Sequence, residues 1–134
     1  MSLFDDIDPA QFIVEFDERF HAAVVDGDED LAAVVDRFHT ADILQVADGH
    51  PMDREKLIAH VRPTRKQRPS LRIEMGDALA EEDRLAARYR MHVGRPRGDD
   101  VERLTIDVHF FGRFALDGRM RSAHILTRME RLGS

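Results

Sequence analysis

Apolar residues recur at helical spacing near the start of the chain, in the series Phe12, Phe16, Phe20 and Val24. Asp8 and Pro9 precede this series, and proline suits a first helical turn because its missing N–H would have no partner there. The pattern predicts a helix that begins at this point and ends near Gly27. A second, shorter helix is predicted from one apolar face, formed by Leu31, Val34, Val35 and Phe38.

A short apolar run and a new set of helix signals follow. The run Ile43–Val46 has the composition of a strand. Asp53 is a suitable N-cap for a third helix, which we expect to extend to about Arg62. Pro63 and Pro69 predict that this helix does not continue much further, because proline lacks the backbone donor and clashes with the preceding turn.

After Pro69 apolar and polar residues alternate. The apolar phase is Leu85, Ala87, Tyr89, Met91 and Val93 in one stretch, and Leu104, Ile106, Val108 and Phe110 in the next. This period of two predicts an antiparallel sheet with one apolar face. Asp117-Gly118 predicts a tight hairpin with a type I′ turn, and residues 94–100 predict a longer hairpin loop.

Helices followed by strands indicate an α+β protein. A length of 134 residues suits a single domain that spans positions 1–134. The apolar face of the sheet needs a cover, and the three N-terminal helices are the segments that can supply it. We therefore expect a cone made of a curved antiparallel sheet and three helices, with a site for a small molecule at its mouth.

Charge and composition narrow the classes of function. A formal charge of −6 disfavours general nucleic-acid binding, which depends on phosphate neutralisation. The basic residues between Arg62 and Arg72 are either solvated residues at a helix C-terminus or a phosphate site. The chain has no cysteine, no apolar run long enough to cross a membrane and no signal-peptide pattern. We expect a cytoplasmic protein with no nucleic-acid or membrane partner.

The order of elements and three stretches of sequence resemble the nuclear-transport-factor-2-like superfamily, and within it the SnoaL-like group of polyketide cyclases. The stretches are FHTADILQVADG, DREKLIAH and LDGRMRSAHI, and the resemblance extends roughly from Pro9 to Met129. It implies a cone-shaped fold that binds a hydrophobic small molecule. It leaves two functions open: an acid–base isomerase, cyclase or dehydratase with no cofactor and no metal, or a non-catalytic ligand-binding or assembly module.

Asp48 is the first candidate catalytic residue. In the ketosteroid isomerases of this superfamily, the general base lies where the first strand ends, which the resemblance places at Asp48 or its neighbour. If Leu44 and Val46 point into the cone, strand alternation directs Asp48 there too, and an apolar surround would raise its pKa. The alternative is a turn residue that bonds to its own backbone.

Two further polar residues are candidates for supporting roles. Tyr89 lies on the apolar phase of its predicted strand, where its hydroxyl could donate to a ligand or simply bond to a backbone carbonyl. His60 on the third helix could act as an acid or base, or be a partly exposed helix residue.

The isomerase resemblance also places Phe20 and Phe110 where hydrogen-bond donors would be needed to stabilise an enolate. Neither side chain can donate, so we expect negligible isomerisation of a ketosteroid. The residues expected to line the pocket are Phe16, Phe20, Val46, Met91, Phe110, Ile125 and Thr127.

The polar phase of the predicted sheet contains two apolar residues, Phe111 and Leu126, beside charges of both signs. Relatives of this fold often dimerise through the outer sheet face, and a two-fold contact needs a self-complementary patch. We therefore expect a homodimer that buries Phe111 and Leu126.

Overall fold

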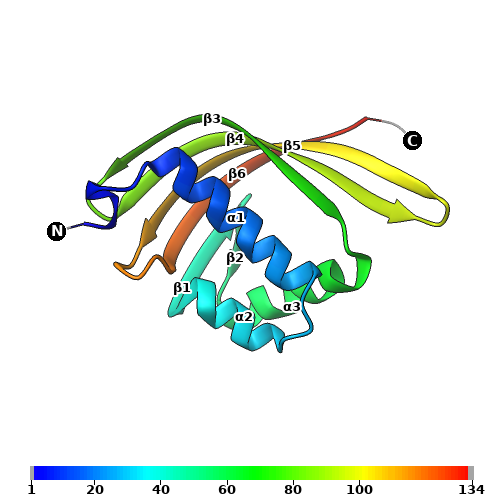
Figure 1. Cartoon of the computed structure of the whole chain (residues 1–134), viewed down its shortest axis with the longest axis horizontal. Helices are drawn as coiled ribbons and strands as arrows, with labels where there is room; N and C mark the ends of the chain where they lie inside the picture. Colours follow the sequence, from blue (N-terminus) through cyan, green and yellow to red (C-terminus); the bar gives the residue numbers. More distant parts are fainter. Residues whose placement is uncertain (1, 133–134) are drawn as a thin grey trace.

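Three main helices and six strands make up the computed structural model, which describes residues 2–132 (Figure 1). The helical elements are a short 3-10 helix η1 (Leu3–Asp5), α1 (Pro9–Val25), α2 (Leu31–Phe38) and α3 (Arg54–Gln67). The strands are β1 (His39–Ala47), β2 (His50–Met52), β3 (Ser70–Glu81), β4 (Arg84–Arg97), β5 (Asp100–Phe114) and β6 (Met120–Arg131). The predicted α+β class and order of elements are confirmed.

Both ends of α1 are fixed by side chains. At the start, the Asp8 carboxylate accepts a hydrogen bond from the backbone N–H of Gln11, and Pro9 occupies the first turn as predicted. At the other end, the guanidinium of Arg65 donates to the carbonyl oxygens of Ala23 and Val24, at 3.2 and 2.8 Å. These carbonyls have no partner within the helix, so Arg65 caps α1 from a neighbouring helix.

The predicted end of the third helix at about Arg62 is too early, because α3 continues through Pro63 to Gln67 and ends before Pro69. Proline at position 63 removes the hydrogen bond to the carbonyl of Ala59, one turn earlier. Both residues are exposed, so water can bond to this carbonyl. The helix ends instead at Arg68, whose φ of 53° is left-handed.

One six-stranded sheet contains all the strands, in the order β2-β1-β6-β5-β4-β3. β1 runs parallel to β6, whereas the other neighbours are antiparallel. The sheet is therefore mixed, which corrects the prediction of a purely antiparallel one. The long connection from β1 through α3 and the β3–β5 meander allows the parallel pair to form. β2 is short and was not predicted.

The turns differ in detail from those predicted. Gly118 has a φ of +88° but Asp117 does not have a positive φ, so the β5–β6 connection is not a type I′ turn. The backbone N–H of Gly118 donates to the carbonyl of Ala115, which fits a type I turn followed by a left-handed glycine. Residues 94–100 form no long loop, because β4 and β5 pair up to Arg97 and Asp100.

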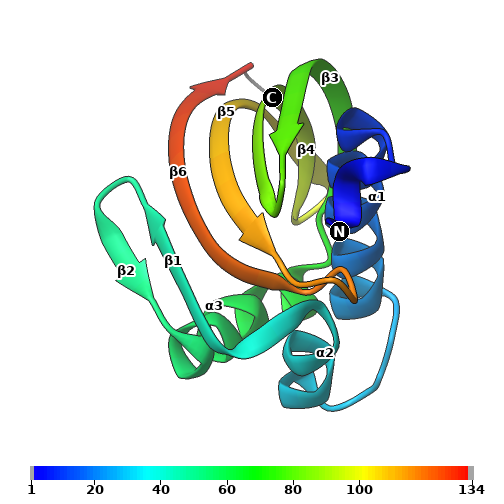
Figure 2. The ribbon, with the colours of Figure 1, turned by 90° about the vertical axis from the view of Figure 1, so that its left-hand side faces the viewer.

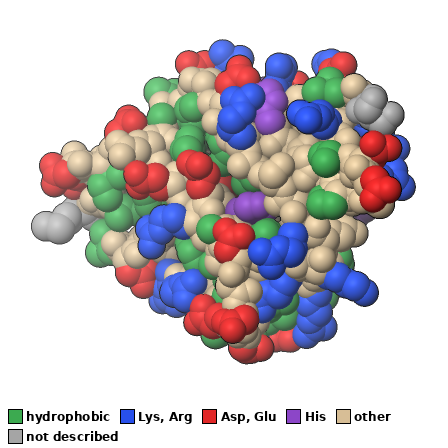
Figure 3. Space-filling view, turned by 45° about the vertical axis from the view of Figure 1, so that its right-hand side comes forward, with side chains coloured by type: hydrophobic (Ala, Val, Ile, Leu, Met, Phe, Trp, Pro, Cys, Tyr) green, Lys and Arg blue, Asp and Glu red, His purple; other side chains and the backbone are tan. Residues whose placement is uncertain are grey.

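The sheet curves around α1, which crosses its inner face, while α2 and α3 lie at one end (Figure 2). Buried residues from all three helices and from β1, β4, β5 and β6 form one apolar cluster. On the face shown in Figure 3, side chains of both charges are mixed, with small hydrophobic areas between them. No described helix is long and apolar enough to cross a membrane.

Candidate functional site

The inner face of the sheet carries a row of side chains from β4, β5 and β6. Tyr89 pairs with Val108, and Val108 pairs with Thr127 on the next strand. Val108 and Tyr89 are only 2% and 8% exposed, whereas the neighbouring inner-face residues Met91 and Ile106 are partly exposed. The apolar side chains around Tyr89 are thus covered, whereas those nearer to the β4–β5 hairpin are partly exposed to solvent.

Asp17 on α1 faces this row and is the site residue that the sequence analysis missed. The Tyr89 hydroxyl lies close to its carboxyl, although the structure has no hydrogen bond between the two side chains, and Asp17 is partly buried. Burial raises the pKa of Asp17 from 3.8 to about 6, and the contact with Tyr89 offsets part of this rise. A usable signal was present, since Asp17 lies in the same helical stripe as Ile13 and Phe20.

Burial also raises the pKa of Tyr89 well above its usual value, and the neighbouring Asp17 charge adds to the effect. The hydroxyl therefore stays protonated and can donate a hydrogen bond over the whole physiological pH range. Asp17, with a pKa of about 6, can exchange a proton near neutral pH. The two side chains together provide one proton acceptor and one permanent donor.

Asp48 lies in a turn at the end of β1. Asp48 and Gly49 have φ values of 52° and 83°, as in a type I′ turn, and they join β1 to β2. The Asp48 carboxylate accepts hydrogen bonds from the backbone N–H of Thr127, at 2.7 Å, and from its hydroxyl. The turn interpretation is confirmed for this residue, although its bonds are to β6 rather than to its own backbone.

The prediction that the pKa of Asp48 is raised is wrong. Hydrogen bonds from the hydroxyl and then the backbone of Thr127 lower the pKa of this exposed carboxylate. The reason is the phase of β1: Ile43 is 2% exposed, whereas Leu44 is 47% exposed. Leu44 and Val46 thus belong to the phase opposite to the core, and the premise that they point inward fails.

Of the other residues predicted to form the site, some lie on the inner face of the sheet and some do not. Met91, Phe110, Ile125 and Thr127 share the inner phase of β4, β5 and β6. Val46 does not, since it pairs with His124 of the outer phase. His60 is exposed on α3. Phe16 and Phe20 pack against Phe38 and His39, away from the row that contains Tyr89.

His39 is a second buried polar residue that the sequence analysis did not select. It is 1% exposed, and its Nδ1 lies 2.8 Å from the carbonyl oxygen of Val35. Burial lowers the pKa of His39, so the ring is neutral at physiological pH. A neutral ring can donate Nδ1–H to this carbonyl at the end of α2, which is a structural role. Among residues 2–132, no group of three or more His, Asp or Glu side chains could hold a metal ion.

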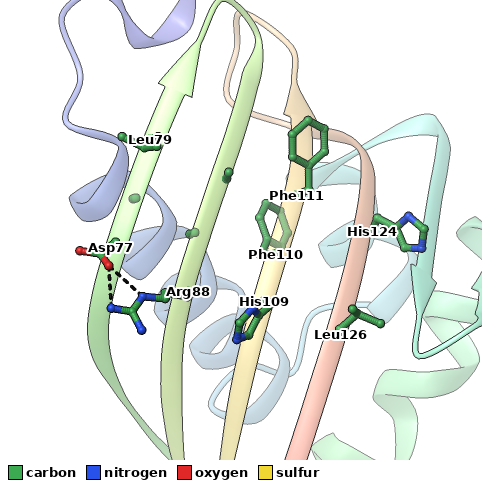
Figure 4. A pocket seen from close by; sticks show the side chains of 11 residues that line it. Asp77, Leu79, Arg88, His109, Phe110, Phe111, His124 and Leu126 are labelled. Carbon is green, nitrogen blue, oxygen red and sulfur yellow. Dashed lines mark hydrogen bonds and ion pairs between the residues drawn. The ribbon is translucent and has the colours of Figure 1, made fainter.

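The outer face of the sheet contains a shallow groove of about 510 Å³. Phe111, Leu126, His109 and His124 line it from β5 and β6 (Figure 4). Phe111 and Leu126 are 48% and 61% exposed, as expected for residues of the outer phase. The ion pair between Asp77 and Arg88, at 2.8 Å, closes the groove at one side.

Comparison with known proteins places this architecture in a family. The profile of the SnoaL-like domain matches residues 18–123, which is most of the chain. The chain therefore belongs to the SnoaL-like family, within the nuclear-transport-factor-2-like superfamily. No protein with a curated description matches the sequence.

Solved structures with the same fold are distant in sequence. A conserved protein from Planctomyces limnophilus has a TM-score of 0.68 and 16% identity, with 90% of this chain and 96% of that chain covered. A "Putative Isomerase" from Rhodopseudomonas palustris has a TM-score of 0.66, 14% identity and coverage of 87% and 88%. A "Putative SnoaL-like polyketide cyclase" from Shewanella denitrificans has a TM-score of 0.63, 9% identity and coverage of 85% and 88%. At these identities the likeness establishes the fold.

The raised pKa of Asp17 predicts how stability depends on pH. A carboxyl whose pKa is raised by folding makes its full contribution below pH 4, and this contribution is lost as the pH rises through about 6. The shift from 3.8 to about 6 corresponds to about 3 kcal/mol, at about 1.4 kcal/mol per pKa unit. Asp17→Asn should therefore raise the free energy of unfolding, relative to the wild type, more at pH 8 than at pH 4.

Urea unfolding at the two pH values measures this difference. The matched control is Asp48→Asn, which removes a carboxylate whose pKa is lowered from 3.8. Its contribution is present above that pH and is lost only at lower pH, so this variant should be destabilised to a similar extent at pH 4 and pH 8. An equal effect of Asp17→Asn at pH 4 and pH 8 would show that this carboxyl is not perturbed in the folded protein.

Proposed function

We propose that this protein is an acid–base enzyme that moves a proton on a hydrophobic small molecule, as in an isomerisation, cyclisation or dehydration. The observation that carries the proposal is the proximity of the partly buried Asp17 carboxyl to the Tyr89 hydroxyl on an otherwise apolar inner face. A buried carboxyl with a raised pKa destabilises the folded protein at neutral pH, and such groups concentrate at functional sites.

Asp17 is the proton acceptor in this proposal. Its carboxylate takes a proton from a carbon next to a substrate carbonyl, and the resulting acid returns the proton to another position of the substrate. A pKa of about 6 allows both steps near neutral pH. Asp48, the acceptor expected from the sequence, is a weaker base because its pKa is lowered.

Tyr89 is the hydrogen-bond donor. Its hydroxyl is protonated throughout the working pH range and can donate to the substrate oxygen on which negative charge develops. The apolar side chains around it, among them Val108 and Met75, exclude water and so strengthen this hydrogen bond.

Asp48 and Thr127 have a structural role outside the proposed reaction. The two hydrogen bonds between them join β1 to β6 one residue beyond the end of β1. Thr127 belongs to the inner phase of β6. They fix the edge of the open part of the inner face. His60, exposed on α3, takes no part in the proposed reaction.

The relatives support the class of reaction. Two of the similar structures are described as a "Putative Isomerase" and as a "Putative SnoaL-like polyketide cyclase". Isomerisation and cyclisation can both begin with the removal of a proton next to a carbonyl group, which needs an acceptor and an oxyanion donor. Asp17 and Tyr89 provide that pair in this chain.

The proposal predicts exchange of carbon-bound hydrogen. In D₂O the wild-type protein should accelerate deuterium incorporation next to the carbonyl of a hydrophobic ketone, as followed by ¹H NMR. Asp17→Asn should reduce the rate by about 100-fold or more, because it removes the acceptor and keeps the shape of the side chain. Tyr89→Phe should reduce the rate and move its pH dependence to higher pH, because Tyr89 lowers the pKa of Asp17 and the variant lacks this effect.

Asp48→Asn serves as the matched control, and its exchange rate should stay within a few-fold of the wild type. If Asp48→Asn abolished exchange and Asp17→Asn did not, the acceptor would be the residue expected from the sequence. A wild-type protein that accelerates no exchange in a panel of aromatic and aliphatic ketones would refute the proposed reaction.

A second candidate function, a non-catalytic binding or assembly module, is favoured by the outer groove. Its apolar side chains and the charges of both signs around it form a surface that could match a second copy of itself. Arg90 pairs with Asp107 at 2.7 Å, and Arg88 pairs with Asp77, so these four charges already have partners in one protomer. Burial of such pairs leaves none of these four charges without a partner.

We expect this surface to form a homodimer in solution. Replacing Phe111 and Leu126 together with glutamate should give a folded monomer, because four like charges would then face one another across the two-fold axis. Light scattering measures the mass. The control is Leu116→Glu, which changes an equally exposed leucine on the β5–β6 turn and should leave the dimer intact. A monomeric wild type at micromolar concentration would contradict the expectation.

A further inference from the structure

A cluster of arginines lies at the far end of the inner face, on the β4–β5 hairpin and at the end of β6. Arg95, Arg97 and Arg131 surround the carboxylate of Glu102, with N–O distances of 3.5, 2.7 and 4.0 Å. The hairpin extends beyond the helices at the right of Figure 1. Three guanidinium groups surround one carboxylate, and Asp100, opposite Arg97 in the register, adds a second acidic side chain, so about one positive charge is in excess.

Glu102 lies at the centre of the cluster but does not accept hydrogen bonds from all three arginines. The Glu102 side chain is only 12% exposed, and of the three arginines only Arg97 has a hydrogen bond to it. Oε1 of Glu102 has no hydrogen-bond partner within residues 2–132. Arg95 and Arg131 are therefore held near the carboxylate by charge, and their N–H donors remain available for a further anion.

The strand register places this cluster on the same face as the proposed site. Arg95 pairs with Glu102 on β5, and Arg131 pairs with Leu104, which belongs to the same phase as Ile106 and Val108. Between the cluster and Tyr89, Met91 and Ile106 are partly exposed, and Met129 is 54% exposed. A continuous inner surface thus runs from a closed apolar end with Asp17 and Tyr89 to an open cationic end.

The distance along this surface sets the size of a ligand. Arg95 lies about six residues beyond Tyr89 on β4, which is at most about 20 Å at about 3.4 Å per residue, and less where the sheet curves. A molecule that touched both ends would need a long apolar body and an anionic end group.

We propose that the ligand of this site is a long-chain amphiphilic carboxylate. Its carboxylate binds Arg95 and Arg131 at the cationic end, and its apolar chain lies on the inner face towards Tyr89. This inference rests on the proposed function for the location of the reacting end. The orientation directs the chain, rather than the carboxylate, to Asp17, where a second negative charge would be repelled.

Binding of a series of fatty acids to the full-length protein tests the proposal. Calorimetry with hexanoate, decanoate and hexadecanoate should show an affinity that increases by up to about fourfold per buried methylene group. Hexadecanol, which has the same chain but no charge, should bind at least about tenfold more weakly than hexadecanoate. Added salt should reduce this preference because the arginines are exposed.

Two double variants of equal charge separate the cluster from the net charge of the protein. Arg95→Gln with Arg131→Gln should lower the affinity for hexadecanoate to that for hexadecanol. Arg103→Gln with Arg128→Gln, on the opposite phase of β5 and β6, should leave the preference unchanged. Circular dichroism and size-exclusion chromatography would establish that each variant is folded.

The outcomes distinguish this inference from the proposed function. Equal binding of the acid and the alcohol, unaffected by Arg95→Gln with Arg131→Gln, would overturn the carboxylate site but leave a hydrophobic substrate possible. Absence of binding by either compound would overturn the carboxylate site, whereas the proposed reaction is decided by the ketone-exchange assay. Preferential binding of the acid with no ketone exchange would support the carboxylate site and identify the protein as a binding module.

Discussion

The position of the partly buried Asp17 carboxyl close to Tyr89 is the interaction on which the functional interpretation depends. It requires α1 to lie across the inner face of β3 and β4 at a fixed position along its axis. Asp8 at the start of the helix and Arg65 at its end provide this constraint, because each satisfies backbone groups that the helix leaves unpaired. The basic segment that includes Arg65 is thus explained, for this residue, by helix capping rather than by phosphate binding.

The two faces of the sheet carry different kinds of side chain. The inner phase holds Tyr89 and apolar side chains and ends in the arginine cluster, whereas the outer phase holds paired charges with Phe111 and Leu126 between them. A one-residue shift in register would exchange these two sets, so the bulge between Met75 and Asp77 and the turns at Gly98 and Gly118 determine which face is which.

Periodicity predicted the fold well because each helix and long strand buries one face. The prediction failed at residues where the local sequence preference differs from what the tertiary structure requires. Pro63 is accepted within α3 because the carbonyl that it leaves unpaired is exposed. The phase of β1 could not be read from Leu44 and Val46, since both phases of this strand are apolar and only pairing with β6 distinguishes them. Asp17 was missed because an acid within an apolar helical stripe is usually counted as a surface residue.

The measurement that tests the central claim most directly is the pKa of Asp17 itself. Carbon-detected NMR of protein labelled at the aspartate carboxyl groups follows each titration, and the spectrum of Asp17→Asn assigns the resonance. The structure predicts that this carboxyl titrates at about 6, above the usual value of 3.8, while Asp48 titrates below that value. A resonance for Asp17 that titrates at or below 3.8 would contradict the account, because the carboxyl would then be an ordinary solvated acid.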